Sequence, residues 1–245
     1  MAAAVAPVLE VARVLPDLAT LPPHLTLESR DGRLCLVDAR PGAPRPLCVD
    51  FTAPETWRRA TSTTLRDLLP RALGLKPTGA TIVDATAGLG TDSLALARLG
   101  CTVICVERSK IIHALLEDGL QRSRAAGPPF ADVAARLSLR HADSAQVLDE
   151  LSSEGHAIDA ILIDPMFGDD GKKAASRAQM QFLAQLADPD EAALPTLLAS
   201  ALRAAPRVAI KRPHRAAVLG KPRHQFEGKA VRFDVYFAAD LRPAA

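Results

Sequence analysis

Short apolar runs and amphipathic stretches alternate along most of the chain, and they predict alternating strands and helices. Strand patterns occur at Thr81–Asp84, Thr102–Glu107, Leu137–Arg140, Ala160–Asp164 and Val208–Lys211. Helical patterns occur at 92–99, 110–124, 144–153, 176–187 and 191–204, and also across Trp57–Leu73. Such alternation through short connections favours a parallel, doubly wound α/β sheet. A last strand, Arg232–Ala238, follows without an intervening helix, so we expect it to run antiparallel to the others.

The first part of the chain has a different pattern. Leu25–Glu28 and Arg33–Val37 alternate apolar and polar residues, and Asp31-Gly32 between them is a strong hairpin turn signal. Three prolines then precede another apolar stretch, Leu47–Phe51. We therefore predict a small β-rich N-terminal subdomain at 1–54 and a larger α/β domain at 55–245.

Composition is typical of a folded cytoplasmic protein. The chain has 245 residues, of which 48% are hydrophobic, which favours a packed core over disorder. No apolar run approaches the roughly 18 residues needed to span a bilayer. Met1–Pro7 lacks the basic and apolar regions of a signal peptide. We therefore expect a cytoplasmic protein with no membrane association.

The cysteines indicate no metal site. Cys35, Cys48, Cys101 and Cys105 form no C-x-x-C pair and have no histidine placed to complete a zinc pattern. Cys101 and Cys105 share an apolar run, which predicts small buried hydrophobic residues. Structural disulfides are not expected in a cytoplasmic protein.

Charge is distributed unevenly along the chain. The net charge is only +2, but the segment from Arg203 to Arg232 holds nine Lys and Arg residues and one acid, Glu227. This excess predicts a phosphate-binding face. A solvated surface without a partner is the alternative interpretation.

Two glycines mark a candidate ligand site after the first strand of the α/β domain. Gly88 and Gly90 follow the strand that ends at Asp84, and a helix opens next with Thr91-Asp92. Glycines allow a tight turn and close approach of a ligand, and a helix N-terminus offers free N–H groups. Ser93 occupies the position of the third glycine of the dinucleotide fingerprint. A tight turn that binds nothing is the alternative.

Polar residues at later strand ends point to a nucleoside. A carboxylate at Glu107, which ends the second strand, is placed to accept both hydroxyls of a ribose. Asp143-Ser144 ends the third strand, where a polar pair is placed to bind an adenine; a helix N-cap is the alternative role. Taken in series with the glycine turn and Asp164, these residues predict binding of S-adenosylmethionine (SAM).

The fourth strand ends in Asp164-Pro165-Met166-Phe167, at the sheet edge where ligands bind in open α/β folds. The carboxylate of Asp164 and the carbonyl of Pro165 are hydrogen-bond acceptors suited to an exocyclic amine. Phe167 is placed to stack on a base; core packing is its alternative role. We therefore predict that Asp164, Pro165 and Phe167 are catalytic.

Several cations near this edge are candidates for RNA phosphate. They are Lys172 and Lys173 in the loop after Phe167, and Lys211, Arg212 and Arg215 at the end of the fifth strand. A plain solvated loop and a structural surface pair are the alternatives.

Five segments, taken in order, resemble the RsmJ family of bacterial small-subunit ribosomal RNA methyltransferases. They are Val83–Gly90, Ala114–Leu120, Asp164–Phe167, Lys211–Pro213 and Arg232–Tyr236. The resemblance implies a Rossmann-like class I SAM-dependent methyltransferase fold and methylation of the N2 amine of a guanine in 16S ribosomal RNA. It also implies donor contacts from Thr91-Asp92, Glu107-Arg108, Asp143-Ser144 and Asp164. The partner would be ribosomal RNA or the small subunit, with no obligate protein partner.

Other functions stay open at this point. A methyltransferase for an amine in DNA, protein or a small molecule would use the same donor site. A non-catalytic RNA-binding module on this scaffold is a further alternative. An NAD-dependent oxidoreductase is disfavoured by the missing third glycine and by the lack of a Tyr/Lys pair, since Tyr236 is the only tyrosine.

Overall fold

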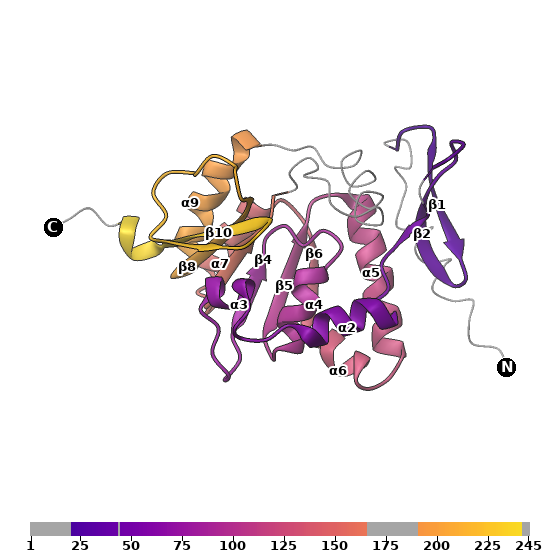
Figure 1. Cartoon of the computed structure of the whole chain (residues 1–245), viewed down its shortest axis with the longest axis horizontal. Coiled ribbons are helices and arrows are strands. Elements are labelled where there is room, and N and C mark those ends of the chain that lie inside the picture. Colours follow the sequence, from indigo (N-terminus) through magenta and orange to yellow (C-terminus); the bar gives the residue numbers. More distant parts are fainter. Residues whose placement is uncertain (1–20, 44, 166–190, 242–245) are drawn as a thin grey trace.

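A computed structural model of the chain describes residues 21–43, 45–165 and 191–241. Their backbone forms two β-sheets, and Figure 1 shows the smaller sheet beside one end of the larger α/β unit. None of the described helices is long and apolar enough to cross a membrane.

Within the described part of the chain, the larger sheet has seven strands in the order β6-β5-β4-β7-β8-β10-β9. They are β4 (Thr81–Asp84), β5 (Thr102–Glu107), β6 (Leu137–His141), β7 (Ala160–Ile163), β8 (Arg207–Pro213), β9 (His224–Glu227) and β10 (Val231–Phe237). Strands β4 to β8 pair in parallel, and β10 pairs antiparallel with β8 and β9. The predicted mostly parallel sheet with an antiparallel last strand is confirmed. The sequence pattern misses β9, because Phe226 is its only apolar residue.

The helices alternate with the strands as predicted. They are α2 (Pro54–Ser62), α3 (Leu68–Leu73), α4 (Thr91–Arg98), α5 (Lys110–Ala125), α6 (Phe130–Ala134), α7 (Ser144–Ser153) and α9 (Leu194–Ala204), with short 3-10 turns η2 (Glu191–Ala193) and η3 (Ala238–Leu241). Four predicted helices are confirmed within a few residues, and the pattern does not predict the short α6. The helix predicted at 176–187 lies outside the described residues.

The prediction of one continuous helical stretch at Trp57–Leu73 is wrong, because the structure has two helices there, α2 and α3. The carboxylate of Asp67 accepts hydrogen bonds from the backbone N–H and the hydroxyl of Thr64, at 2.6 and 3.0 Å. Side chains that bond to nearby backbone in this way compete with helical hydrogen bonds. The chain therefore leaves the helix after Ser62 and starts a new one at Leu68.

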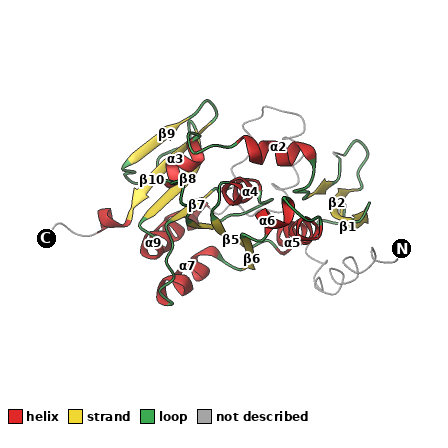
Figure 2. Ribbon diagram, turned by 90° about the horizontal axis from the view of Figure 1, so that it is seen from below, coloured by secondary structure: helices red, strands yellow, loops and turns green. Residues whose placement is uncertain are grey.

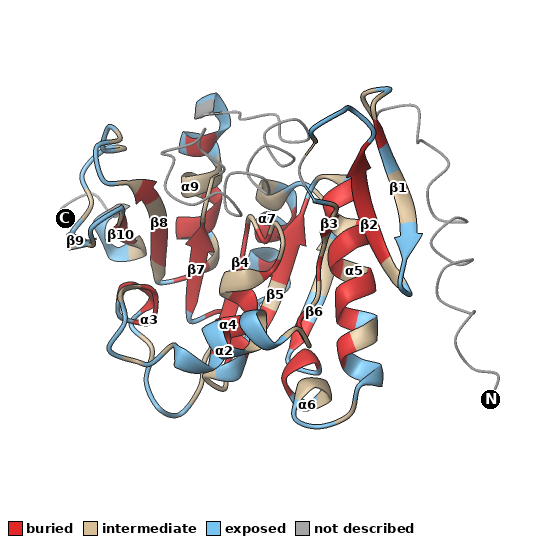
Figure 3. Cartoon of the chain, turned by 45° about the vertical axis from the view of Figure 1, so that its right-hand side comes forward, coloured by how far each residue is buried: buried red, intermediate tan, exposed pale blue. Residues whose placement is uncertain are grey.

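Helices cover both faces of the larger sheet. Figure 2 shows α7 and α9 on one side and α2, α3 and α4 on the other. Ile82 and Val83 are neighbours on β4, both fully buried, yet they belong to different apolar clusters. Successive side chains of a strand point to opposite faces, which explains this division. Strands buried on both faces read as continuous apolar runs, and Figure 3 shows the central strands as mostly buried.

The smaller sheet is antiparallel, with β1 (Leu25–Arg30), β2 (Arg33–Asp38) and β3 (Leu47–Cys48). The predicted Asp31-Gly32 turn is confirmed: both residues have positive φ, 51° and 71°, as a two-residue hairpin loop requires. The sheet contacts α5, where the backbone N–H of Leu34 donates to the Asp118 carboxylate at 3.1 Å. The subdomain boundary at residue 54 stays a prediction.

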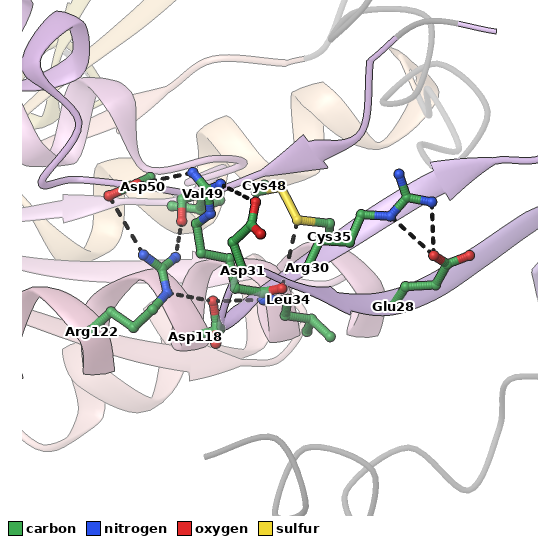
Figure 4. Close-up of a disulfide and its surroundings, with 11 residues drawn as sticks. Glu28, Arg30, Asp31, Leu34, Cys35, Cys48, Val49, Asp50, Asp118 and Arg122 are labelled. Atoms are coloured by element: carbon green, nitrogen blue, oxygen red, sulfur yellow. Dashed lines mark hydrogen bonds and ion pairs between the residues drawn. A yellow bond between two sulfur atoms is a disulfide. The ribbon is translucent and has the colours of Figure 1, made fainter. Parts of the chain in front are cut away.

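Cys35 and Cys48 form a disulfide, so the expectation of no structural disulfide is wrong (Figure 4). The two residues are direct partners in the β2–β3 ladder, with Cα atoms 4.4 Å apart. That separation permits a disulfide. The prediction used only the reducing conditions of the cytoplasm, and it did not consider that strand pairing could bring these two cysteines together. Cys101 and Cys105 are buried and unpaired, as predicted.

Candidate active site

The glycine turn joins β4 to α4 at the carboxyl edge of the sheet. Gly88 and Gly90 have positive φ, 53° and 72°, and Gly90 is the N-cap of α4. A Cβ atom at Gly90 would lie 2.7 Å from Leu116 Cδ1 and 2.9 Å from Phe51 Cζ. Glycine is therefore required at position 90 for both its conformation and its packing.

Glu107 ties the end of β5 to this turn. Its two carboxylate oxygens accept backbone hydrogen bonds from Gly88 at 2.9 Å and from Ser109 at 2.8 Å. Burial raises the pKa of the Glu107 carboxyl, and these N–H groups oppose that rise. The adjacent Arg108 is exposed. The carboxylate predicted to accept ribose hydroxyls thus lies directly beside the glycine turn.

Asp84 lies beneath the turn and is only 2% exposed. It accepts hydrogen bonds from the Ser93 hydroxyl at 2.5 Å and from the Thr86 N–H at 3.4 Å. Burial raises the pKa of Asp84 to about 7, with further contributions from Asp92 and Asp164 and opposition from Ser93. Sequence reasoning missed the role of Ser93, which stands where a dinucleotide site has glycine and instead donates to this buried acid.

Asp143 and Ser144 follow β6 and begin α7. The Asp143 carboxylate accepts from the N–H groups of Ala145 and Gln146 at 2.9 and 3.2 Å, so the alternative role of helix N-cap is confirmed. Asp143 is also exposed, which leaves it accessible to a ligand. The Ser144 hydroxyl donates to the carbonyl of Ala85, which links α7 to the start of the glycine turn.

Asp164 and Pro165 directly follow β7, between β4 and β8. The backbone N–H of Asp164 donates to the Thr86 hydroxyl at 2.6 Å, a contact that sequence reasoning missed. The Lys211 ammonium lies 2.8 Å from Asp164 Oδ2 and 2.7 Å from Asp92 Oδ2. The structure therefore brings Asp92, which was predicted to contact the methyl donor, close to Asp164, which was predicted to bind the amine, at one edge of the sheet. Met166, Phe167, Lys172 and Lys173 lie outside the described residues.

Two of the three predicted cations at the end of β8, Lys211 and Arg212, have internal partners. Lys211 is held by two carboxylates. Arg212 is 7% exposed and donates to the carbonyl of Ala217 at 3.1 Å. Arg215 is exposed. The predicted RNA role of all three stays a prediction, but only the placement of Arg215 favours it.

The loop after β8, which we call the clamped loop (residues 214–219), is fixed by buried side chains of β8 and β10. Arg232 donates to the carbonyls of His214 and Ala216, both at 2.7 Å. Tyr236 donates to the carbonyl of Leu219 at 2.6 Å, and Arg212 adds the contact to Ala217. The basic segment from Arg203 to Arg232 therefore contains two kinds of cation. Some, such as Arg212 and Arg232, bind backbone carbonyl groups, whereas others, such as Arg215, face solvent.

Comparison with known proteins identifies the chain. Residues 18–238 match a sequence family described as "Putative SAM-dependent methyltransferase". A protein from Alteromonas mediterranea named ribosomal RNA small subunit methyltransferase J is 40% identical over 217 residues, which cover 86% of this chain and 81% of that protein. The chain belongs to the methyltransferase J family. The resemblance seen in the sequence is thus confirmed.

Further relatives agree. A methyltransferase J from Dechloromonas aromatica is 38% identical, with 86% of each chain covered. The crystal structure of a SAM-dependent methyltransferase from Neisseria gonorrhoeae superposes with a TM-score of 0.72 at 28% identity and covers 96% of each chain. The predicted class I methyltransferase fold is therefore confirmed, and SAM is the cofactor of this methyltransferase J family member.

The residues present fit SAM. A turn with glycine at positions 88 and 90 leads into a helix N-terminus, and a carboxylate lies beside it. This combination suits a ligand that carries a ribose and a polar tail. Among the described residues no group of three or more His, Cys, Asp or Glu is arranged to hold a metal ion.

Proposed function

We propose that this protein transfers the methyl group of SAM to the exocyclic N2 amine of a guanine in the 16S ribosomal RNA of the small subunit. The names of its relatives support the ribosomal RNA substrate. The observation that carries the amine chemistry is the position of Asp164-Pro165, at the carboxyl end of β7 and bonded to the glycine turn through Thr86. Two acceptors at that point suit an amine with two N–H groups.

On the donor side, we assign Glu107 to the ribose hydroxyls and Asp143-Ser144 to the adenine. The N-terminus of α4, directly after the turn at Gly88 and Gly90, offers the first backbone N–H groups of the helix. The remaining donor contacts in this proposal are Asp84, which supports the turn from below, and Thr91, Asp92, Arg108 and Asp164, which surround it. SAM supplies a methyl group on a positively charged sulfur, which makes the methyl carbon an electrophile.

On the acceptor side, the guanine amine is a weak nucleophile because its lone pair is delocalised into the ring. The Asp164 carboxylate and the Pro165 carbonyl accept its two N–H groups and so hold the nitrogen in line with the methyl carbon. Bound SAM would supply the methyl carbon to this nitrogen and keep the electron pair of the broken carbon–sulfur bond, and the nitrogen would release one proton to water. Orientation supplies most of the acceleration, and no covalent enzyme intermediate forms.

For RNA phosphate we propose the exposed cations of the basic segment. Arg215 lies on the clamped loop, and Lys221 and Lys229 are also exposed. Each phosphate contact contributes about one unit to the salt dependence of binding. Single replacements of Arg215 or Lys229 by Ala are therefore expected to weaken RNA binding and to lower the salt slope. Lys172 and Lys173 remain further candidates.

The function is tested by transfer of labelled methyl from SAM to small subunits and to naked 16S RNA that lack the modification. Nuclease digestion should place the label on N2-methylguanosine. Asp164→Ala is expected to abolish transfer while the protein stays folded, and Asp149→Ala, an exposed acid on α7, serves as the control. Label on another atom, or near-normal transfer by Asp164→Ala, would contradict the proposal.

A further inference from the structure

Lys211 joins the donor and acceptor sides of the site. Its ammonium group contacts Asp92 Oδ2 at 2.7 Å and Asp164 Oδ2 at 2.8 Å. Asp92 lies in the first turn of α4, Asp164 follows β7, and Lys211 itself lies on β8. One side chain therefore connects the helix that follows the glycine turn to the residue assigned to the amine.

We propose that Lys211 is a positioning residue of methyl transfer, which pairs with the Asp164 carboxylate and fixes it relative to the glycine turn. This inference rests on the proposed function, because it assigns the purpose of the contact to the amine acceptor. It replaces the RNA-phosphate role that the sequence predicted for Lys211.

The surroundings of Asp164 explain why a cation is needed there. Among the residues that the structure describes, the charged groups that face this position are Asp84 from β4, Asp92 from α4 and Lys211 from β8. Burial raises the pKa of the Asp164 carboxyl, Lys211 opposes the rise, and Asp92 adds to it. Without Lys211, three carboxyl groups would share one partly buried site, and like charges favour protonation of at least one of them.

Lys211 is suited to this role because it remains charged. Burial alone would lower the pKa of its ammonium group, but the two carboxylates and their hydrogen bonds outweigh burial and raise it. Its side chain is 24% exposed, as is that of Asp92. An ammonium group with two carboxylate partners carries no surplus charge for a phosphate, which argues against an RNA contact.

The geometry of Asp164 is fixed from two directions. Lys211 holds Oδ2 of the carboxylate, and Thr86 accepts the hydrogen bond of the Asp164 backbone N–H at 2.6 Å. The second carboxylate oxygen, Oδ1, is therefore given a defined direction. A protonated or rotated Asp164 would lose the acceptor that orients the amine.

Lys211→Met and Lys211→Arg test the inference against Lys221→Met, an exposed lysine of the same basic segment. We expect Lys211→Met to lower kcat by on the order of 100-fold, with KM for RNA and the salt slope of RNA binding unchanged. The acid limb of its pH–rate profile should move to higher pH. Lys211→Arg should recover part of kcat, and Lys221→Met should raise KM only. Unchanged kcat and acid limb with a lower salt slope would overturn the inference.

A second measurement needs no RNA. Carbon-13 NMR titration of Asp164 in the free protein should show a higher pKa in Lys211→Met than in the wild-type protein, and thermal unfolding would confirm that the variant is folded. An unchanged Asp164 titration overturns the inference even if kcat falls. If the wild-type protein transfers no methyl to 16S RNA, the proposed function fails, but this titration still decides whether Lys211 controls Asp164.

Discussion

The ring of Phe51 lies against Gly90 so closely that a Cβ atom at Gly90 would be 2.9 Å from Phe51 Cζ. Phe51 follows the last strand of the small sheet, whereas Gly90 begins α4. The Cδ1 atom of Leu116, on α5, would lie 2.7 Å from the same Cβ atom. The turn proposed to bind SAM is therefore supported by side chains from two other parts of the fold.

Gly90→Ala should lower both stability and SAM affinity. A residue with a Cβ at φ 72° costs about 1–2 kcal/mol, and overlap with Phe51 and Leu116 adds roughly 1–3 kcal/mol. Urea unfolding and calorimetric titration with SAM measure the two effects. Gly155→Ala is the matched control, because Gly155 has φ 71° and open space around its Cβ position. Equal destabilisation by both variants would show that the packing against Phe51 contributes nothing.

Gly119→Ala should be destabilising even though alanine is the better helix former. Alanine gains up to about 1 kcal/mol within a helix. A Cβ at Gly119 would, however, lie 2.5 Å from Val49 Cγ1 and 3.0 Å from the Val49 carbonyl oxygen. A double-mutant cycle with Val49→Ala measures the contact by urea unfolding, and we expect a coupling energy of about 1 kcal/mol or more. Additive effects would mean that α5 and the segment directly after β3 are not tightly packed here.

Asp84 should make stability fall as pH rises. Its pKa is raised to about 7 in the folded protein, against about 3.9 in the unfolded chain. Between these values the folded state binds more protons than the unfolded state. The contribution of Asp84 to the free energy of unfolding is therefore fully present below about pH 4 and is lost by about pH 7. The free energy of unfolding falls by up to about 1.4 kcal/mol per pH unit between these values.

Asp84→Asn removes this titration. The unfolding free energy of the variant relative to wild type should shift in favour of the variant as pH rises from about 4 to about 7. Urea unfolding in the absence of SAM at several pH values measures the trend. Asp149→Asn, at an exposed acid, should follow the wild-type curve. A constant difference between Asp84→Asn and wild type would show that Asp84 titrates normally.

Arg232→Ala should unfold the protein more readily, since it leaves the buried Asp234 carboxylate without its cationic partner, although Asp234 still accepts a hydrogen bond from the Gln225 amide at 2.8 Å. Arg232 and Asp234 are 5% and 1% exposed and are joined by two hydrogen bonds of 2.9 and 3.1 Å. Loss of one partner of such a pair costs about 3–5 kcal/mol. Arg215→Ala, on the same segment but exposed, should change stability by less than about 0.5 kcal/mol. Urea unfolding compares the two, and similar stabilities would contradict the internal role of Arg232.

The strands of the sheet, apart from β9, are largely predictable from the sequence, because strands buried on both faces are continuous apolar runs with polar residues at their ends. The roles of Lys211 and Arg212 are not. Both are cations at one strand end, but neighbouring residues of a strand point to opposite faces. Lys211 consequently meets Asp92 of α4, while Arg212 lies under the clamped loop. The charge of a residue in a sequence does not reveal which groups its side chain contacts on either face of the sheet.

The small sheet shows the same limit. Its hairpin turn follows from Asp31-Gly32, because the required positive φ values are a local property. The Cys35–Cys48 disulfide and the contact between Phe51 and Gly90 depend on register and on tertiary packing. Neither has a local signal that sequence reasoning could use.

The path of the clamped loop is determined mainly outside the loop. Its carbonyl groups are held by Arg212, Arg232 and Tyr236, which belong to the strands beneath it. Arg215 and Val218 on the loop point to solvent, and Val218 is 46% exposed. Outward side chains can therefore be exchanged while the backbone keeps its course. The charge and shape of this surface can therefore vary within the same fold.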